Sequence, residues 1–206
     1  MKNLQDFPRI CLAALPTPIQ KLENISRLLG TNIYIKRDDL TGIGLGGNKV
    51  RKLEFLLADA KRKGAEIVFT TGGAQSNHAM LTAACAKKLG MTPILILKKR
   101  GVTERKGNQL LEYLMDTDVR FVDTDDYNDI YAEMDRVGKE LGRPYYKSPA
   151  AGRTGSARWA MSAACRRSPK AACTSTISAA RRAAAAPMRA LRWARGCLCR
   201  RRRPLA

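Results

Sequence analysis

Two short segments of the chain hold the residues that are best suited to do chemistry. In the first, Gly46-Gly47-Asn48-Lys49, two glycines precede a lysine at the start of a predicted helix, residues 48–63. The positive end of the helix dipole disfavours the ammonium form of a lysine at that place. Lys49 is therefore suited to react as a neutral amine, which is the form that builds a Schiff base with a carbonyl compound.

The second segment is Gly72-Gly73-Ala74-Gln75-Ser76-Asn77-His78, at the start of a predicted helix over residues 76–89. Hydrogen-bond donors at a helix start suit an anion, such as the carboxylate of a substrate. Simpler interpretations stay open for three of these residues. Ser76 or Asn77 would merely cap the helix, and His78 would be an ordinary surface histidine.

The elements that must position these residues alternate along the chain. Helical spacing predicts helices over 19–29, 48–63, 76–89, 104–115 and 127–141. Short apolar runs predict strands over 32–36, 66–70, 92–97 and 119–122, with one more beginning at Tyr145. Such alternation predicts a parallel, doubly wound α/β sheet, with ligands bound at the carboxyl ends of its strands.

Composition excludes several classes of function. The 206 residues carry a formal charge of +20, which would suggest nucleic acid if it were evenly spread. Residues 148–206 hold 14 of the 38 Lys and Arg and no Asp or Glu, so residues 1–147 have an ordinary charge of +6. A nucleic-acid partner is therefore disfavoured. The only histidine is His78 and no Cys-x-x-Cys occurs, so no metal site is expected. We also expect a cytoplasmic protein with no signal peptide and no membrane contact.

Four motifs in order give the chain a family resemblance over about residues 8–147. Leu15-Pro16-Thr17-Pro18 and Ile35-Lys36-Arg37-Asp38-Asp39 precede the two segments described above. Together they closely resemble the pyridoxal-phosphate enzymes of the D-cysteine desulfhydrase and 1-aminocyclopropane-1-carboxylate deaminase family. The resemblance implies the type II pyridoxal-phosphate enzyme fold (tryptophan synthase β-like), with helices on both faces of a twisted parallel sheet. It also implies a homodimer, a small α/β domain over 48–147 and a larger cofactor domain that begins with 1–47.

The resemblance also implies a role for each candidate residue. Lys49 would carry pyridoxal 5'-phosphate and move the substrate α-proton, and Asn77 would hydrogen-bond the ring hydroxyl of the cofactor. Ser76 and His78 would contact the substrate carboxylate or assist proton transfer, with Gln75 a weaker candidate for substrate binding. Asn48 and Lys52 would lie near the cofactor, where Lys52 is either a counter-charge for the phosphate or a solvated helix lysine. The carboxylates of Asp38 and Asp39 are expected to anchor a loop.

The basic tail, residues 148–206, has the character of an out-of-frame translation and is expected to be poorly ordered. Reading each codon one nucleotide earlier turns Trp159-Ala160 into a forced glycine. One permitted decoding from Ser148 is I-P-G-G-G-S-N-R-L-G-A-L-G-Y-V, which is similar to the segment that follows in the family. Residues 182–190 permit G-S-G-G-T-H-A-G, which resembles the family's phosphate-binding loop. We therefore expect the C-terminal part of the fold to be truncated or frameshifted, although a genuine basic tail remains the alternative.

The expected function is a lyase that eliminates the thiol of D-cysteine to give pyruvate, sulfide and ammonia. The alternative is a deaminase acting on 1-aminocyclopropane-1-carboxylate. Because the family's deaminases tend to carry glutamine where this chain has His78, the histidine favours the desulfhydrase. A third alternative is an inactive, frameshifted remnant of such an enzyme.

Overall fold

The structure is a computed structural model that describes residues 7–99 and 105–149. These residues fall into two compact units, which are described separately. The larger one, here called the α/β unit, combines residues 7–16 with the described part of 38–149. The smaller one is Thr17–Arg37. The predicted domain boundaries stay a prediction, and all but Ser148 and Pro149 of the expected poorly ordered tail lies outside the described residues.

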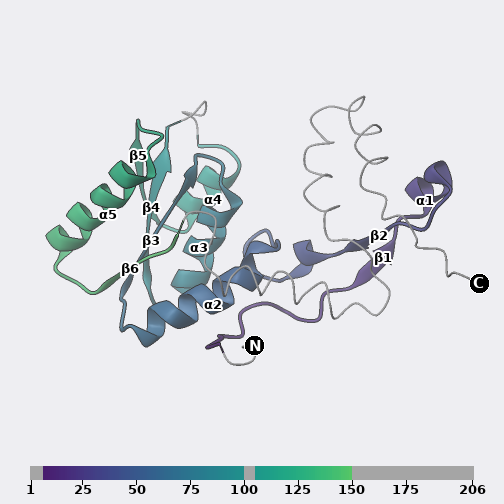
Figure 1. Cartoon of the computed structure of the whole chain (residues 1–206), viewed down its shortest axis with the longest axis horizontal. Coiled ribbons are helices and arrows are strands. Elements are labelled where there is room, and N and C mark those ends of the chain that lie inside the picture. Colours follow the sequence, from purple (N-terminus) through teal and green to yellow (C-terminus); the bar gives the residue numbers. More distant parts are fainter. Residues whose placement is uncertain (1–6, 100–104, 150–206) are drawn as a thin grey trace, which may run out of the picture. The chain divides into compact units, whose positions relative to one another are not determined.

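The α/β unit is built on a four-stranded sheet in the order β5-β4-β3-β6 (Figure 1). Its strands are β3 (Ile67–Gly73), β4 (Thr92–Lys98), β5 (Asp118–Val122) and β6 (Tyr145–Lys147). Its helices are α2 (Lys49–Arg62), α3 (Asn77–Lys88), α4 (Asn108–Leu114) and α5 (Tyr127–Leu141). Every strand pair is parallel, so the predicted parallel sheet is confirmed.

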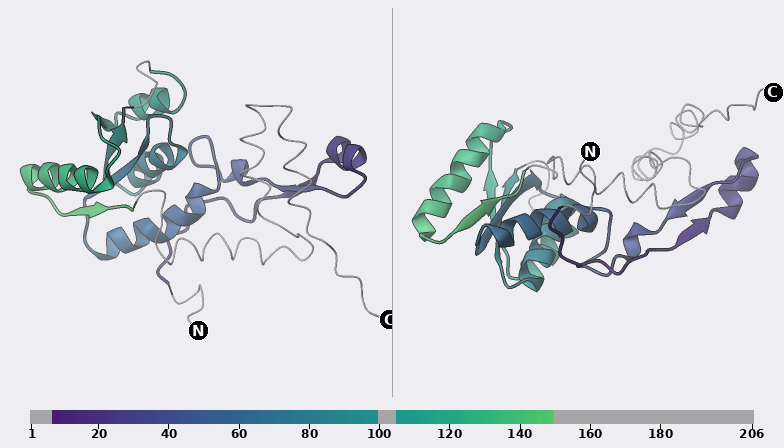
Figure 2. Two further views of the ribbon diagram at one scale, coloured as in Figure 1. Left: turned by 45° about the horizontal axis from the view of Figure 1, so that its top comes forward. Right: turned by 60° about the horizontal axis from the view of Figure 1, so that its bottom comes forward.

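Alternation along the central strands puts helices on both faces of this sheet. Ile67 and Phe69 of β3 pack with α5 residues, whereas Val68 between them packs with residues of α2 and α3. Successive side chains of a strand point to opposite faces, which is why a continuous apolar run can serve two helical layers. Figures 1 and 2 show α5 on one side of the sheet and α2 and α3 on the other.

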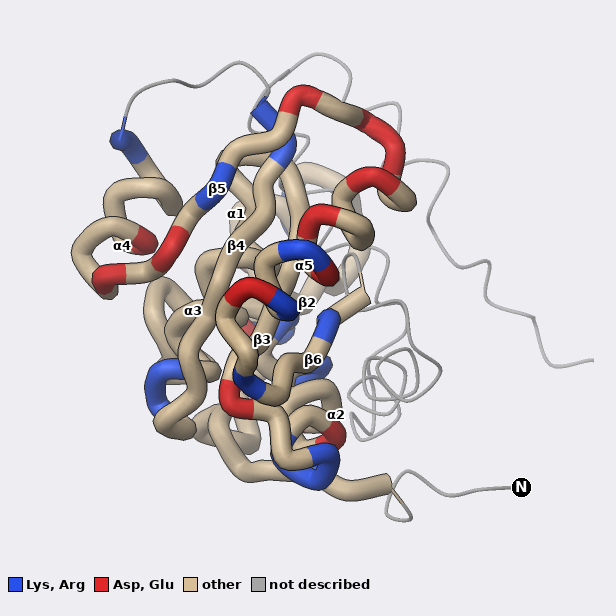
Figure 3. Tube along the Cα trace, turned by 90° about the vertical axis from the view of Figure 1, so that its left-hand side faces the viewer, with Lys and Arg blue, Asp and Glu red and all other residues tan. Residues whose placement is uncertain are grey.

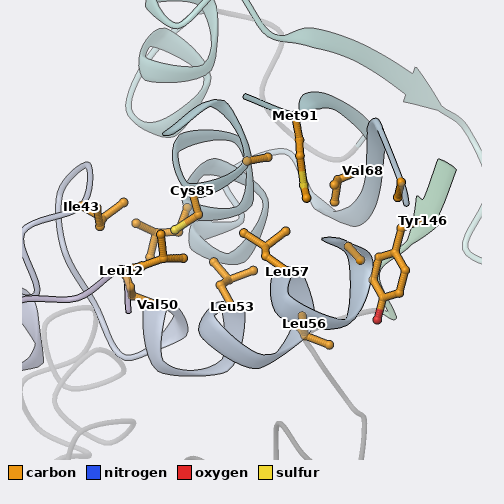
Figure 4. Packing of buried hydrophobic residues seen from close by; sticks show 14 of the residues in the cluster. Leu12, Ile43, Val50, Leu53, Leu56, Leu57, Val68, Cys85, Met91 and Tyr146 are labelled. Atoms are coloured by element: carbon orange, nitrogen blue, oxygen red, sulfur yellow. The ribbon is translucent and has the colours of Figure 1, made fainter. Parts of the chain in front are cut away.

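The core between α2, α3 and the sheet holds the start of α2 in place. Val50, Leu53 and Leu57 of α2 are fully buried and belong to the same cluster as Cys85 of α3 (Figure 4). Each large apolar side chain buried in this way contributes about 1.5–3 kcal/mol. Because Val50 directly follows Lys49, this packing determines where the lysine can lie.

A buried carboxylate ties the N-terminal segment to α2. The side chain of Glu54 accepts hydrogen bonds from the backbone nitrogens of Leu12 and Ala13, each at 3.0 Å. It also pairs with Arg9, whose Nη2 lies 2.7 Å from Glu54 Oε2. Paired and hydrogen-bonded in this way, a charge can be buried without a large penalty.

The smaller unit is a two-stranded antiparallel ribbon with one helix. β1 (Ile19–Lys21) pairs with β2 (Tyr34–Lys36), and α1 (Glu23–Leu29) connects them. Gly30 ends α1 in the left-handed conformation, with φ of 61°. The predicted helix over 19–29 is therefore wrong for residues 19–21. The apolar spacing fits a helix, but the backbone of this stretch bonds instead to β2, a partner that local spacing does not reveal.

A second boundary differs from the prediction. The helix expected over 104–115 begins only at Asn108, and residues 105–107 are not helical. Gly107 sets this start, with φ of 59° and ψ of −125°. That conformation is open to glycine and strained for other residues, so the chain turns there before the helix begins.

Charges of both signs are interspersed over β5, α5 and β6, as Figure 3 shows. Asp118 pairs with Arg120 at 3.0 Å, and Asp135 with Lys147 at 2.7 Å. Among the described residues, no helix is long and apolar enough to cross a membrane.

Glu112 carries a buried carboxyl group for which the described residues supply no hydrogen-bond partner. Glu112 of α4 is fully buried, and neither side-chain oxygen accepts a hydrogen bond within the described part of the chain. Burial raises its pKa from 4.5 to about 7. Between pH 4.5 and 7 Glu112 therefore retains a proton in the folded chain that it has lost in the unfolded chain, so the contribution of Glu112 to stability falls as the pH rises through this window.

We predict that Glu112→Gln removes this loss. A change of one unit in pKa corresponds to about 1.4 kcal/mol, so the variant should gain about 3 kcal/mol relative to the native chain between pH 4 and pH 8. Urea unfolding at a series of pH values measures the difference. Glu140→Gln on the exposed face of α5 is the matched control, and an equal pH-dependent gain there would contradict the prediction.

Candidate active site

The loop before Lys49 is fixed by a buried ion pair. Nε and Nη2 of Arg51 donate to the two oxygens of Asp38, at 2.8 and 2.7 Å. The backbone oxygen of Asp38 also accepts from the Gly47 nitrogen at 2.7 Å. The expectation that Asp38 anchors a loop is confirmed. A bidentate pair of this kind costs about 3–5 kcal/mol to break from one side, so it holds the loop firmly against α2.

Gly46 cannot be replaced without disturbing this loop. Its φ is 69°, and a Cβ atom there would lie 1.8 Å from the backbone oxygen of Asp39. The close approach explains why position 46, two residues before Asn48, is a glycine. The loop thereby leads directly into α2.

Lys49 is the first residue of α2, as predicted from its place behind the glycines. It is half-buried, and its Nζ donates to Asn48 Oδ1 at 3.2 Å. Lys52, one helical turn later, is also half-buried. Asn48 is the N-cap residue by position, but its side chain makes no capping hydrogen bond.

The second predicted segment lies at the carboxyl end of β3, which runs through Gly72 and Gly73 into α3. Ser76 is the N-cap of α3, and its Oγ accepts from the Ala79 nitrogen at 3.3 Å. The capping interpretation therefore holds for Ser76 and is wrong for Asn77. A Cβ atom at Gly72 would lie 2.6 Å from Ser76 Oγ, so the glycine leaves room for the serine.

His78 is the most unusual residue of the site. It is 3 % exposed, and within the described structure neither ring nitrogen has a hydrogen-bond partner. Burial, and next the positive charges of Lys49 and Lys52, lower its pKa from 6.5 to about 4. The interpretation as a surface histidine is therefore wrong. The effect of both lysines on His78 indicates that the start of α2 lies near the start of α3, which agrees with the packing of these two helices in one core.

Sequence reasoning missed Asn108, which joins this site from α4. Its Nδ2 donates to Asn77 Oδ1 at 2.6 Å and to the Gln75 backbone oxygen at 3.0 Å. Gln75 itself is exposed, and its amide bonds to residues 106 and 108. The pair Gly107-Asn108 could have pointed to this residue. It precedes the helix after β4, just as the Gly-rich segment precedes the helix after β3. Strand ends in a parallel sheet meet at one edge, so the two turns are neighbours.

Comparison with known proteins identifies the family of this arrangement. The sequence pattern of the family described as "Pyridoxal-phosphate dependent enzyme" matches residues 10–166. The chain belongs to this family. A Pyrococcus horikoshii protein, named provisionally as a 1-aminocyclopropane-1-carboxylate deaminase, is 49 % identical over 152 residues. That alignment covers 72 % of this chain and 46 % of the relative. A Yersinia pestis D-cysteine desulfhydrase is 46 % identical over 151 residues, covering 70 % of this chain and 46 % of the relative.

Solved structures agree with the family and its fold. The crystal structure of a homologue of 1-aminocyclopropane-1-carboxylate deaminase matches with a TM-score of 0.74 and 42 % identity. The match covers 82 % of this chain and 53 % of that one. Diaminopropionate ammonia lyase from Escherichia coli, at 16 % identity and a TM-score of 0.54, shares the fold. The chain thus spans about half the length of the curated relatives it matches.

The residues at this edge fit the family's cofactor. Lys49 offers an amine at a helix start, Asn77 offers an amide, and Lys52 offers positive charge for a phosphate. Among the residues that the structure describes, neither ring nitrogen of His78 has a hydrogen-bond partner, so both are available to a bound group. Among the described residues, no group of three or more His, Cys, Asp or Glu could hold a metal ion.

We predict that His78 stays neutral down to about pH 4. Its protonation would bury a charge beside two cationic lysines, so the unfolded chain binds that proton first. The contribution of His78 to stability is therefore lost as the pH falls from 6.5 to 4, by about 3 kcal/mol, and His78→Gln should gain about this amount relative to the native chain over the same pH range.

A proton NMR titration checks the pKa directly, because His78 is the only histidine of the chain. Urea unfolding of the native chain and of His78→Gln at each pH checks the stability. A ring titration centred near pH 6.5 would contradict the assigned burial.

Proposed function

We propose that this chain is part of a pyridoxal-phosphate-dependent lyase of the D-cysteine desulfhydrase type. The observation that carries the proposal is that the charge of half-buried Lys49 acts on His78, a buried imidazole at the start of α3 with no hydrogen-bond partner among the described residues. A half-buried amine beside an uncharged imidazole is suited to proton transfer at a substrate carbon. The desulfhydrase relative, at 46 % identity, supports the same assignment.

In this proposal the residues of α2 hold the cofactor and move the proton. The ring of pyridoxal phosphate, when bound, supplies an electron sink for the charge left on the substrate α-carbon. Lys49 Nζ would hold the cofactor before substrate arrives and, once released as a free amine, would take the α-proton. Asn48 orients Lys49 through the 3.2 Å hydrogen bond, and Lys52 supplies charge for the phosphate.

The residues of α3 bind the substrate. Ser76 and the backbone nitrogens that follow it lie at the positive end of the helix dipole, where a carboxylate is stabilised. Asn77 donates to the ring hydroxyl oxygen of the cofactor. His78, neutral at pH 7, can donate one hydrogen bond and accept another without adding a charge to the site. Gln75 contributes indirectly, because its side chain hydrogen-bonds the backbone of residues 106 and 108 and so stabilises the turn before α4.

The second candidate is deamination of 1-aminocyclopropane-1-carboxylate, for which the Pyrococcus horikoshii relative is named. Lys49 and Ser76 would serve both reactions. His78 favours the desulfhydrase, because the deaminases tend to carry glutamine at this position. An inactive, frameshifted remnant of such an enzyme is the third candidate.

We predict that borohydride reduction of the 206-residue chain mixed with pyridoxal phosphate attaches the cofactor at Lys49. Lys49 combines a helix start with partial burial, and both favour the reactive neutral amine. Peptide mass mapping locates the adduct. Lys49→Ala should lose it, whereas Lys61→Ala, an exposed lysine on the same helix, should retain it.

Product assays then distinguish the candidates. Release of pyruvate and sulfide from D-cysteine supports the desulfhydrase, and release of ammonia from 1-aminocyclopropane-1-carboxylate supports the deaminase. Cofactor attached at Lys49 with neither reaction supports the remnant. Random attachment at surface lysines would refute the proposed site.

We predict that Ser76→Ala keeps the adduct at Lys49 but loses substrate binding. Protection of Lys49 from reduction by D-cysteine should weaken, and turnover should fall on the order of 100-fold. The lost cap also costs about 1 kcal/mol of stability. Asp126→Ala is the matched control, because Asp126 caps α5 by accepting from the Asn128 nitrogen at 2.9 Å. If Asp126→Ala impaired D-cysteine protection equally, the effect of Ser76 would be one of stability alone.

A further inference from the structure

Three side-chain amides form a network whose orientation is fixed by backbone atoms. The Asn108 backbone nitrogen donates to Gln75 Oε1 at 2.9 Å, and Gln75 Nε2 donates to the Lys106 backbone oxygen at 2.8 Å. A backbone N–H can only donate and a backbone carbonyl can only accept. The Gln75 amide can therefore satisfy both neighbours in one orientation only.

The same reasoning fixes Asn108 and then Asn77. The group of Asn108 that faces the Gln75 backbone oxygen, at 3.0 Å, must be the donor Nδ2. That nitrogen also lies 2.6 Å from the side chain of Asn77, which must therefore present its acceptor Oδ1. Consequently the Asn77 amide directs Oδ1 towards α4 and has Nδ2 as its donor for other groups.

The central residue of the network is buried, although Gln75 at one end of it is exposed. Asn108 is only 8 % exposed. Gly107 permits the approach, since its φ is 59° and a Cβ atom there would lie 2.6 Å from Gln75 Oε1. Three hydrogen bonds through Asn108 thus tie the turn after β3 to the start of α4, and partial burial makes it costly to leave any of them unmade.

We propose that Asn108 is a positioning residue that sets the Asn77 amide so that its nitrogen faces the cofactor. The inference rests on the proposed function, in which Asn77 contacts the ring hydroxyl oxygen. An oxygen of that kind is best met by a donor. By holding Asn77 Oδ1 towards α4, Asn108 keeps this acceptor occupied and leaves the amide nitrogen to meet the ring hydroxyl oxygen.

The decisive variant is Asn108→Asp, which keeps the size of the side chain and the backbone bond to Gln75 but has no side-chain donor. Removing the donor releases Asn77 Oδ1 and favours the reversed amide. The dissociation constant of pyridoxal phosphate, from absorbance titration of the 206-residue chain, should rise about 10-fold. Asn77→Ala should produce a rise of similar size, and the double variant should be no weaker than Asn77→Ala alone.

A purely structural role would give a different pattern. Gln75→Ala is the matched control, because it loosens the turn but leaves the Asn108 donor and Asn77 in place. It should lower the stability to urea with less than a 3-fold change in the dissociation constant. If Asn108→Asp and Asn77→Ala had multiplicative effects on cofactor binding, or if Gln75→Ala weakened binding as much as Asn108→Asp, the inference would be overturned.

A measurement without cofactor separates this inference from the proposed function. In the cofactor-free chain both side-chain amide protons of Asn108 should exchange slowly with solvent by NMR, and Asn77→Ala should make one of them fast. Fast exchange of both in the native chain would refute the network even if Lys49 bound the cofactor. Slow exchange with no adduct at Lys49 would leave the amide orientation standing and refute the proposed function.

Discussion

The parallel pairing of β3 with β4 is the constraint on which the rest of the α/β unit depends. Seven residue pairs run from Ile67 and Thr92 to Gly73 and Lys98, so both strands end at the same edge. The chain leaves that edge twice, once into α3 and once, after the loop, into α4. Every candidate group on these two helices is brought to one place because the strands run in the same direction.

The packing of the two sheet faces gives that edge its rigidity. Alternate residues of β3 and β4 are buried against different helices, which makes a shift in register costly on both sides at once. α2 is held through Val50, Leu53 and Leu57, and its first residue is Lys49. The position of the Lys49 amine is thus a consequence of the apolar packing of the residues that follow it in the helix.

Buried polar groups in this unit fall into two kinds. The carboxylates of Asp38 and Glu54 are each paired with an arginine. Each residue also accepts a backbone hydrogen bond, Glu54 through its side chain and Asp38 through its backbone oxygen. His78 and Glu112 are buried without a partner in the described residues, and burial shifts the pKa of each towards its neutral form. The first kind holds loops in place. At His78 the second kind leaves two ring nitrogens that a ligand can hydrogen-bond. At Glu112 it only lowers stability, because burial of the carboxyl is not offset by a hydrogen bond.

The sequence by itself determined the features that depend on local patterns. Apolar period and glycine ends predicted α2, α3 and α5 to within a residue or two, because a helix is stabilised by contacts three and four residues apart. The motifs around Lys49 and Ser76 identified the family. Only the tertiary structure decided that residues 19–21 form a strand, because their partner lies beyond α1. It also decided that His78 is buried and that Asn108 belongs to the site, since burial and hydrogen bonds between distant turns arise only when the strands pair.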